Sequence, residues 1–213
     1  MATTAQSGTR NERRRAATRQ ALVTAARQLL AEGEEAAASI QHIAERADVG
    51  FGSFYNHFAS KADLFEAAVT EAMEEFGAAF DRGLHGVDDP AELLAGGFRL
   101  AARMADTHPE LMQVLRRRSI GLLHADTGLA PRARRDLEHG IATGRFLPVD
   151  VTLAMTALGG TLLALIELRF ARPDVDCDTA AAGLAEMVLR MLGLSAEDSG
   201  EVIRRPLPEI MPA

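Results

Sequence analysis

The chain has 213 residues, of which 47% are hydrophobic and 25% are charged. This balance is that of a soluble globular protein, and it excludes a collagen, a coiled-coil rod and a wholly disordered chain. The formal net charge of −7 is unevenly distributed, because residues 1–30 carry six arginines and one glutamate, whereas the chain from Lys61 onward carries 16 basic and 24 acidic residues. A basic amino-terminal segment on an acidic body indicates a polyanionic partner at one end. A solvated basic tail is the alternative.

The cysteine content and the apolar runs predict a cytoplasmic protein without a membrane partner. The single cysteine, Cys177, cannot form an internal disulfide, and the first residues lack the apolar core of a signal peptide. The longest apolar run, Leu153–Ile166, has 14 residues. We expect this run to form a buried helix because it is too short to span a bilayer.

Nearly the whole chain is predicted to be helical, because alanine and leucine dominate and no segment alternates with period two. Glycine and proline punctuate the pattern: Gly33 ends the first helix, and Asp89-Pro90 begins a later one. The predicted helices cover, in chain order, residues 12–32, 40–47, 51–57, 60–83, 90–106, 109–118, 131–143, 149–171 and 178–192. Residues 194–213, which contain three prolines, are predicted to be an irregular tail.

Two short helices around a three-residue turn, placed between two longer helices, have the layout of a helix-turn-helix. The second short helix must bury one face and leave the other polar and unobstructed, so that it can enter a major groove. The residues expected on the buried side are Ile43, Ala47, Val49, Phe54 and Phe58. The residues expected on the exposed side are Gly52, Ser53, Tyr55, Asn56 and His57.

The segment from Ser39 to Phe65 resembles the amino-terminal domain of the TetR family of transcriptional regulators. The residues that carry the resemblance are Ile43-Ala44, Val49, Gly52, Phe54-Tyr55, His57-Phe58 and Ser60-Lys61-x-Asp63-Leu64. The family usually has glycine at the position of Asp48, although aspartate tolerates the left-handed backbone that the turn needs. It also often has serine or threonine at Gly50, and a small, polar or basic residue at Phe51.

The resemblance implies an all-α protein that binds double-stranded DNA. Tyr55, His57 and Lys61 would donate to phosphates, and Ser39 and Gln41 would touch the DNA backbone at the start of the helix over 40–47. Gly50, which caps the next helix, also belongs to the expected DNA-binding residues. Phe51, Gly52, Ser53 and Asn56 would face the base edges, with Asn56 suited to pair with adenine and Phe51 to lie against a thymine methyl or a sugar. Arg13, Arg14 and Arg15 would follow a minor groove or the phosphates.

The resemblance also implies the domain organisation. Residues 1–12 would be a flexible basic arm, 13–60 the DNA-binding domain, 61–193 a helical ligand-binding and dimerisation domain, and 194–213 the tail. The helix over 61–82 would join the two domains and act as a stiff lever. Two-fold half-sites in DNA independently favour a homodimer. The small and apolar residues expected at the dimer interface are Ala157, Gly160, Ala164, Leu184, Val188 and Met191.

An effector pocket should combine apolar walls with a few polar groups. The residues expected to form it are Phe98, Met104, His108, Met112, Arg116, His124, Met155 and Arg169. No metal site, cofactor or catalytic residue is predicted, because the histidines are widely spaced and Cys177 lies between two aspartates that raise a thiol pKa. We therefore expect no enzyme but a repressor released from its operator by a small organic ligand. The alternatives are a constitutive or architectural DNA-binding dimer, and a helical ligand-binding or catalytic module with a vestigial DNA-binding region.

Overall fold

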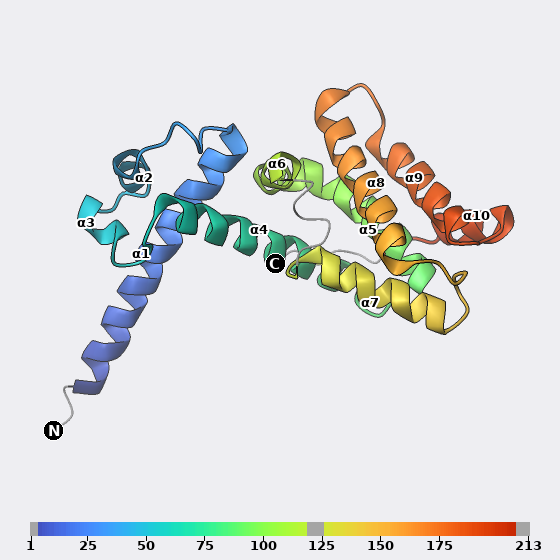
Figure 1. The fold of residues 1–213 in the computed structure, drawn as a ribbon, viewed down its shortest axis with the longest axis horizontal. Helices are drawn as coiled ribbons and strands as arrows, with labels where there is room; N and C mark the ends of the chain where they lie inside the picture. The colour runs from blue at the N-terminus through green and yellow to red at the C-terminus, as the bar shows by residue number, and fades with distance from the viewer. Residues whose placement is uncertain (1–3, 119–125, 208–213) are drawn as a thin grey trace. The chain divides into compact units, whose positions relative to one another are not determined.

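The computed structural model describes residues 4–118 and 126–207, which form ten helices and no strand (Figure 1). The helices that build the amino-terminal part are α1 (Thr4–Glu32), α2 (Ile40–Arg46), α3 (Phe51–Phe54) and α4 (Lys61–Gly83). Those that follow are α5 (Pro90–Thr107), α6 (Pro109–Arg118), α7 (Leu129–Ala142), α8 (Val151–Ala171), α9 (Cys177–Met191) and α10 (Ala196–Arg204). The predicted all-α fold is confirmed.

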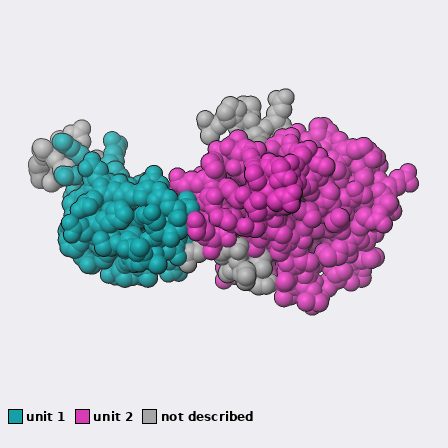
Figure 2. Space-filling model, turned by 90° about the horizontal axis from the view of Figure 1, so that it is seen from above, with its two compact units in different colours: residues 1–72 teal, residues 73–213 magenta. Residues whose placement is uncertain are grey.

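The chain divides into two compact units, residues 1–72 and 73–213 (Figure 2). The division falls within α4, whereas the sequence placed the domain boundary at its first residue. The first half of α4 belongs to unit 1 because it buries Leu64 and Ala68, and because Glu71 accepts a 2.6 Å hydrogen bond from Arg19 of α1. The second half of α4 belongs to unit 2.

Two predictions about the ends of the chain are wrong. Residues 4–12 are the first turns of α1 and not a flexible arm, because extending an existing helix by one residue costs little. Residues 196–204, predicted to be irregular, form α10, which Ser195 caps by accepting a hydrogen bond from the Asp198 amide at 3.1 Å. Val202 anchors this helix in the core of unit 2, and Pro206 follows its end.

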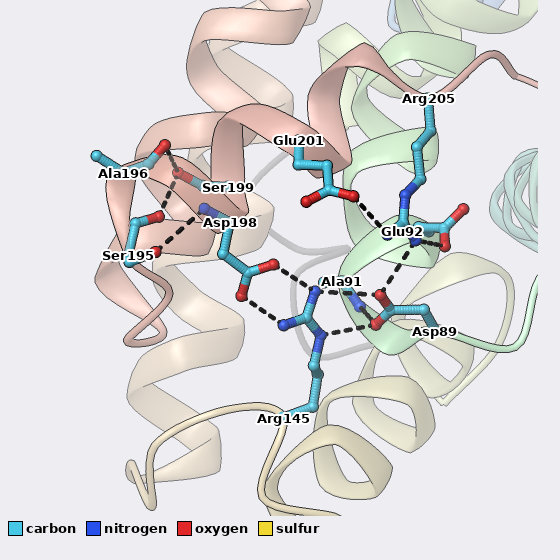
Figure 3. A network of polar contacts seen from close by, with 10 residues as sticks. All are labelled: Asp89, Ala91, Glu92, Arg145, Ser195, Ala196, Asp198, Ser199, Glu201 and Arg205. Atoms are coloured by element: carbon cyan, nitrogen blue, oxygen red, sulfur yellow. Dashed lines mark hydrogen bonds and ion pairs between the residues drawn. The ribbon is translucent and has the colours of Figure 1, made fainter.

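A network of charged side chains fastens α10 to the start of α5 (Figure 3). The Arg145 guanidinium donates to Asp89, the N-cap of α5, at 2.9 Å, and to Asp198 of α10 at 2.6 Å. Arg205, just after α10, donates to Glu92 in the first turn of α5. These contacts connect three segments that are far apart in the sequence.

Helix α8 is less buried than predicted. It packs beside α9 and over α5 (Figure 1), but only 28% of its most apolar 18-residue window is buried. By length and composition alone this helix is long and apolar enough to cross a membrane. The expectation that the segment is too short therefore does not hold, because the helix extends beyond the apolar run to 21 residues. Most of this apolar window is therefore not covered within one subunit.

Candidate nucleic-acid interface and ligand cavity

The turn between α2 and α3 has the backbone geometry that a helix-turn-helix needs. Ser39 caps α2 by accepting a hydrogen bond from the His42 amide at 3.1 Å. Asp48 has φ of 53°, and it is the one described non-glycine residue with a positive φ. The left-handed turn that the family usually builds with glycine is thus formed here with aspartate, which tolerates this region better than most residues.

Helix α3 is shorter than predicted, and residues 55–57 continue it as turns. Phe54 is completely buried and Phe58 nearly so, which fixes one side of this segment against unit 1. The other side is open, because Phe51 and Tyr55 are 53% and 55% exposed and Asn56 is also exposed. A Cβ atom added to Gly52 would meet nothing within 4 Å. Phe51, Tyr55 and Asn56 of the expected reading surface are therefore accessible to solvent.

Of the other residues predicted to contact DNA, some have exposed side chains and others form hydrogen bonds within the chain. Arg13, Arg14 and Arg15 are exposed on α1. Ser39 is exposed, although its hydroxyl serves as the cap of α2, and the Gln41 amide donates to Glu45 at 2.9 Å. Gly50 is exposed, whereas Ser53 and His57 are half-buried.

Lys61 has a structural role that the sequence did not reveal. Its ammonium donates hydrogen bonds to the carbonyl oxygens of Glu35, Ala36 and Ala38 at 3.0, 3.1 and 2.9 Å. Because an ammonium has three N–H donors, these carbonyls occupy all of them. The predicted donation to a phosphate does not fit this arrangement. Lys61 instead fastens the start of α4 to the loop between α1 and α2.

His57 lies in a cationic environment. Partial burial lowers the pKa of His57 below its ordinary value, and the positive charges of Arg15 and Arg19 lower it further. The imidazole is therefore held in its neutral form more firmly than a histidine in water. A phosphate placed beside it would have the opposite effect, since an anion favours the protonated ring.

Unit 2 contains a cavity of about 410 Å³. It lies among α4, α5, α7 and α8, and Phe98 and Met155, two of the residues predicted for a pocket, contribute to its wall. Most of the wall is apolar, including Phe76 and Phe80 of α4 and Leu158 of α8. This mixture of size and lining is typical of a site for a small organic molecule.

The other predicted pocket residues lie elsewhere. Met104 and Met112 are buried outside the cavity wall, and His108 ends α5 beside Thr107. Arg116 pairs with Glu167 at 3.2 Å, and Arg169 pairs with Asp106, so each guanidinium is neutralised outside the cavity. His124 lies outside the described residues.

The polar residues of the cavity are ones that the sequence analysis missed. They are Asp81, His85, Arg132, Arg135 and Asp136. Arg132 donates to Asp81 at 2.8 Å and to the Gly128 carbonyl oxygen at 2.5 Å, which orients its guanidinium. Only the spacing of Arg132, Arg135 and Asp136 along one helical face offered a signal in the sequence.

Gly128, the residue before α7, also connects α7 to α4. The Gly128 amide donates to the Glu74 carboxylate at 2.6 Å, and this hydrogen bond is the largest cause of the lowered pKa of Glu74. Gly128 has φ of 71°, and a Cβ atom there would lie 2.8 Å from the Met73 carbonyl oxygen. The start of α7 is therefore held directly against α4 at the edge of the cavity.

The predicted dimer-interface residues lie on α8 and α9 with different exposures. Gly160, Ala164 and Met191 are exposed, Ala157 and Leu184 are half-buried, and Val188 is buried in the core of its own subunit. Val188 therefore offers little surface to a partner. Leu153 and Met187 are 72% and 68% exposed. A Cβ atom on Gly160 or Gly183 would meet nothing within 4 Å.

The single thiol lies in surroundings that disfavour its ionised form. Cys177 is buried, and burial is the largest cause of its raised pKa. The positive charge of Arg169 opposes this rise, whereas the negative charges of Asp106, Asp176 and Asp178 add to it. No group of three or more His, Cys, Asp or Glu residues in the described ranges is placed to hold a metal ion.

Unit 1 thus has the layout of a helix-turn-helix DNA-binding domain, and unit 2 is a helical unit with a mostly apolar cavity. Two family models match the chain: one described as bacterial regulatory proteins of the tetR family, over residues 22–68, and one described as the tetracyclin repressor-like C-terminal domain, over residues 89–205. The chain belongs to the TetR family of bacterial regulatory proteins.

Solved structures include related chains. RolR in complex with resorcinol is 36% identical, with 93% of this chain and 99% of the RolR chain covered and a TM-score of 0.64. A TetR-family regulator from Shewanella sp. PV-4 is 18% identical over 84% of this chain and 99% of its own, with a TM-score of 0.71. FadR from Bacillus subtilis, bound to stearoyl-CoA, is 19% identical over 80% and 97% with a TM-score of 0.64. The last two likenesses concern the fold alone. No curated protein matches the chain.

Proposed function

We propose that this TetR-family regulator is a repressor that binds a near-palindromic operator as a homodimer and is released by a small organic ligand. The observation that carries the proposal is the combination, in one chain, of an uncovered reading surface around α3 and a cavity lined by α4, α5, α7 and α8. Helix α4 contributes residues to both units, so a change at the cavity has a continuous helix through which to act. The site of action would be cytoplasmic.

The uncovered faces of α8 and α9 support the homodimer. The large apolar side chains of Leu153 on α8 and Met187 on α9 are exposed, which is costly in water, and the open space at Gly160 allows close approach of another helix. A second copy of this chain would bring the same faces together in an isologous contact. This also accounts for an apolar helix that is mostly uncovered within one subunit.

We propose a small phenol as the effector. RolR, a 36% identical relative, is known in complex with resorcinol, a benzene ring with two hydroxyl groups. In this chain the apolar wall suits a ring, and Asp81 and Asp136 provide carboxylates that accept hydrogen bonds from hydroxyl groups. Arg132 and Arg135 provide donors for the hydroxyl oxygens.

The proposal is tested in two steps. DNA bound by the purified protein is first selected from genomic fragments, and the operator is then titrated with protein in the presence of resorcinol, phenol or benzoate. Resorcinol at a hundred times its Kd should also raise the melting temperature by about 5–10 °C. The variant Asp136→Asn should bind operator normally but require more resorcinol for release.

The competing reading is a constitutive or architectural DNA-binding dimer without an effector. It predicts that none of these compounds changes the melting temperature or the affinity for DNA. An effector that acts on the operator must bind less tightly to the protein–DNA complex than to the free protein, by the same factor by which it weakens DNA binding. Equal affinity in both titrations would therefore favour the constitutive reading.

A further inference from the structure

Helix α3 presents an aromatic ring to solvent on the surface expected to read DNA. Among the described residues, six large apolar side chains are exposed, and Phe51 and Tyr55 are the two in unit 1. Their ring centroids are 5.9 Å apart in an edge-to-face arrangement. Tyr55 in turn contacts the buried ring of Phe54, with centroids 5.3 Å apart. Phe51 thus packs against the ring of Tyr55 while about half of its surface stays exposed.

The ring of Phe51 contributes little to the fold. Phe54 fills the core position of this helix, and Gly50 and Gly52, on either side of Phe51, carry no side chains that would shield the ring. The open space around Gly52 also allows a flat molecular surface to approach closely. An uncovered phenylalanine in such a place is suited to an apolar contact made on binding.

Phenylalanine has no hydrogen-bond donor or acceptor, so it cannot read the polar edges of bases. The apolar feature that distinguishes one base in the major groove is the 5-methyl group of thymine. We propose that Phe51 determines part of the operator specificity by covering the methyl group of one thymine in each half-site. This inference rests on the proposed function, because it requires that the chain binds DNA through α3.

The test removes the methyl group and nothing else. In the operator selected as described above, each thymine is replaced in turn by uracil, and the Kd is measured by fluorescence anisotropy for the wild-type protein and for Phe51→Ala. We expect one symmetric position at which uracil weakens wild-type binding about fourfold per half-site, and about fifteenfold when both half-sites are changed, as for the burial of one methyl group. At this position Phe51→Ala should bind thymine and uracil equally.

Two controls keep the outcome interpretable. Phe51→Ala should melt at the wild-type temperature, because the ring lies outside the core, and Phe51→Leu should retain part of the discrimination. If wild-type protein binds all the uracil operators as tightly as the thymine operator, Phe51 does not contact a thymine methyl group. That result would overturn this inference but not the proposal that the protein binds DNA. The same conclusion follows if Phe51→Ala keeps the discrimination, which assigns the thymine to another residue. Failure to select any DNA sequence would overturn the proposed function and this inference together.

Discussion

Lys61 illustrates how one side chain changes role between sequence and structure. As a lysine at the start of a helix beside the reading head, it matches the pattern of a phosphate contact. In the structure its ammonium instead satisfies three carbonyl oxygens of the loop between α1 and α2. These carbonyls are 23 to 26 residues away in the sequence, and no local pattern indicates that they converge on one point.

We predict that Lys61→Met destabilises unit 1 without removing a phosphate contact. The substitution keeps the apolar stem and leaves the carbonyls without their donor, which should cost about 1–2 kcal/mol. The melting temperature should fall, while the slope of log Kd against log salt for operator binding should stay at the wild-type value. A slope that decreases by about one would instead place Lys61 on a phosphate.

His57 predicts a pH dependence of DNA binding. Its pKa in the free protein lies below the ordinary 6.5, chiefly through burial and also through Arg15 and Arg19, so the ring is neutral at pH 7. If the ring donates to a phosphate in the complex, its pKa rises on binding and a proton is taken up. Affinity should then increase as the pH falls from about 8 to 6. His57→Gln, measured over the same range, should show a flatter profile, and an unchanged profile would remove His57 from the contact.

Several residue-scale features were accessible from the sequence and others were not. The caps at Ser39 and Asp89, and the left-handed backbone at Asp48, follow from the short-range chemistry of these residue types. The polar side of the cavity did not, because Asp81 and Arg132 meet only after α4 and α7 have packed together. The prediction that Arg116 and Arg169 line the pocket was wrong because each guanidinium pairs with a carboxylate in the folded chain. Arg116 pairs with Glu167, and Arg169 pairs with Asp106.

At the scale of elements, the charged network around Arg145 adds polar contacts to the apolar packing that holds α10 on unit 2. Its bonds to Asp89 and Asp198 are partly shielded from water, because Arg145 and Asp89 are only 25% and 22% exposed. No local sequence pattern indicates that Arg145, which follows α7, contacts the starts of both α5 and α10. The prolines near the end of the chain suggested an irregular tail, yet all of them follow α10.

We predict that Arg145→Met lowers the stability of unit 2 by about 1–2 kcal/mol, between the values for exposed and buried ion pairs. Arg172→Met is the matched control, because its pair with Asp174 is 61% and 65% exposed and should contribute little. Thermal melts of both variants measure the difference. Equal melting temperatures for the two variants would show that the Arg145 contacts do not hold α10 in place.

The contribution of Arg145 should also depend on pH. Its hydrogen bonds lower the pKa of Asp198 below the ordinary 3.8, so folding favours the ionised carboxylate. The stabilisation is therefore present above the ordinary pKa and is lost as the pH falls through the lowered value. The melting temperatures of the wild type and Arg145→Met should accordingly converge below about pH 4.

At the scale of the whole molecule, α8 provides a test of the proposed dimer. Among the described residues, no atom beyond the neighbouring backbone of α8 lies within 4 Å of a Cβ added to Gly160, so we expect Gly160→Leu to leave the subunit fold intact. In a dimer formed through α8 and α9, the same side chain would separate the two helices. We predict a shift from dimer to monomer in sedimentation velocity, and a smaller shift for Gly160→Ala. An intact Gly160→Leu dimer would place the interface elsewhere.

The apolar face that α8 leaves uncovered also makes the stability of the fold dependent on mass action. If two subunits bury this face against each other, association stabilises the folded state, and the melting temperature becomes a function of protein concentration. We predict that dilution from micromolar to nanomolar protein lowers the melting temperature of the wild type, whereas Gly160→Leu melts at one temperature throughout. In a bacterium that makes few copies of this regulator, the folded state would therefore be less stable than at higher concentration. Binding of a dimer to an operator would in turn stabilise the folded state.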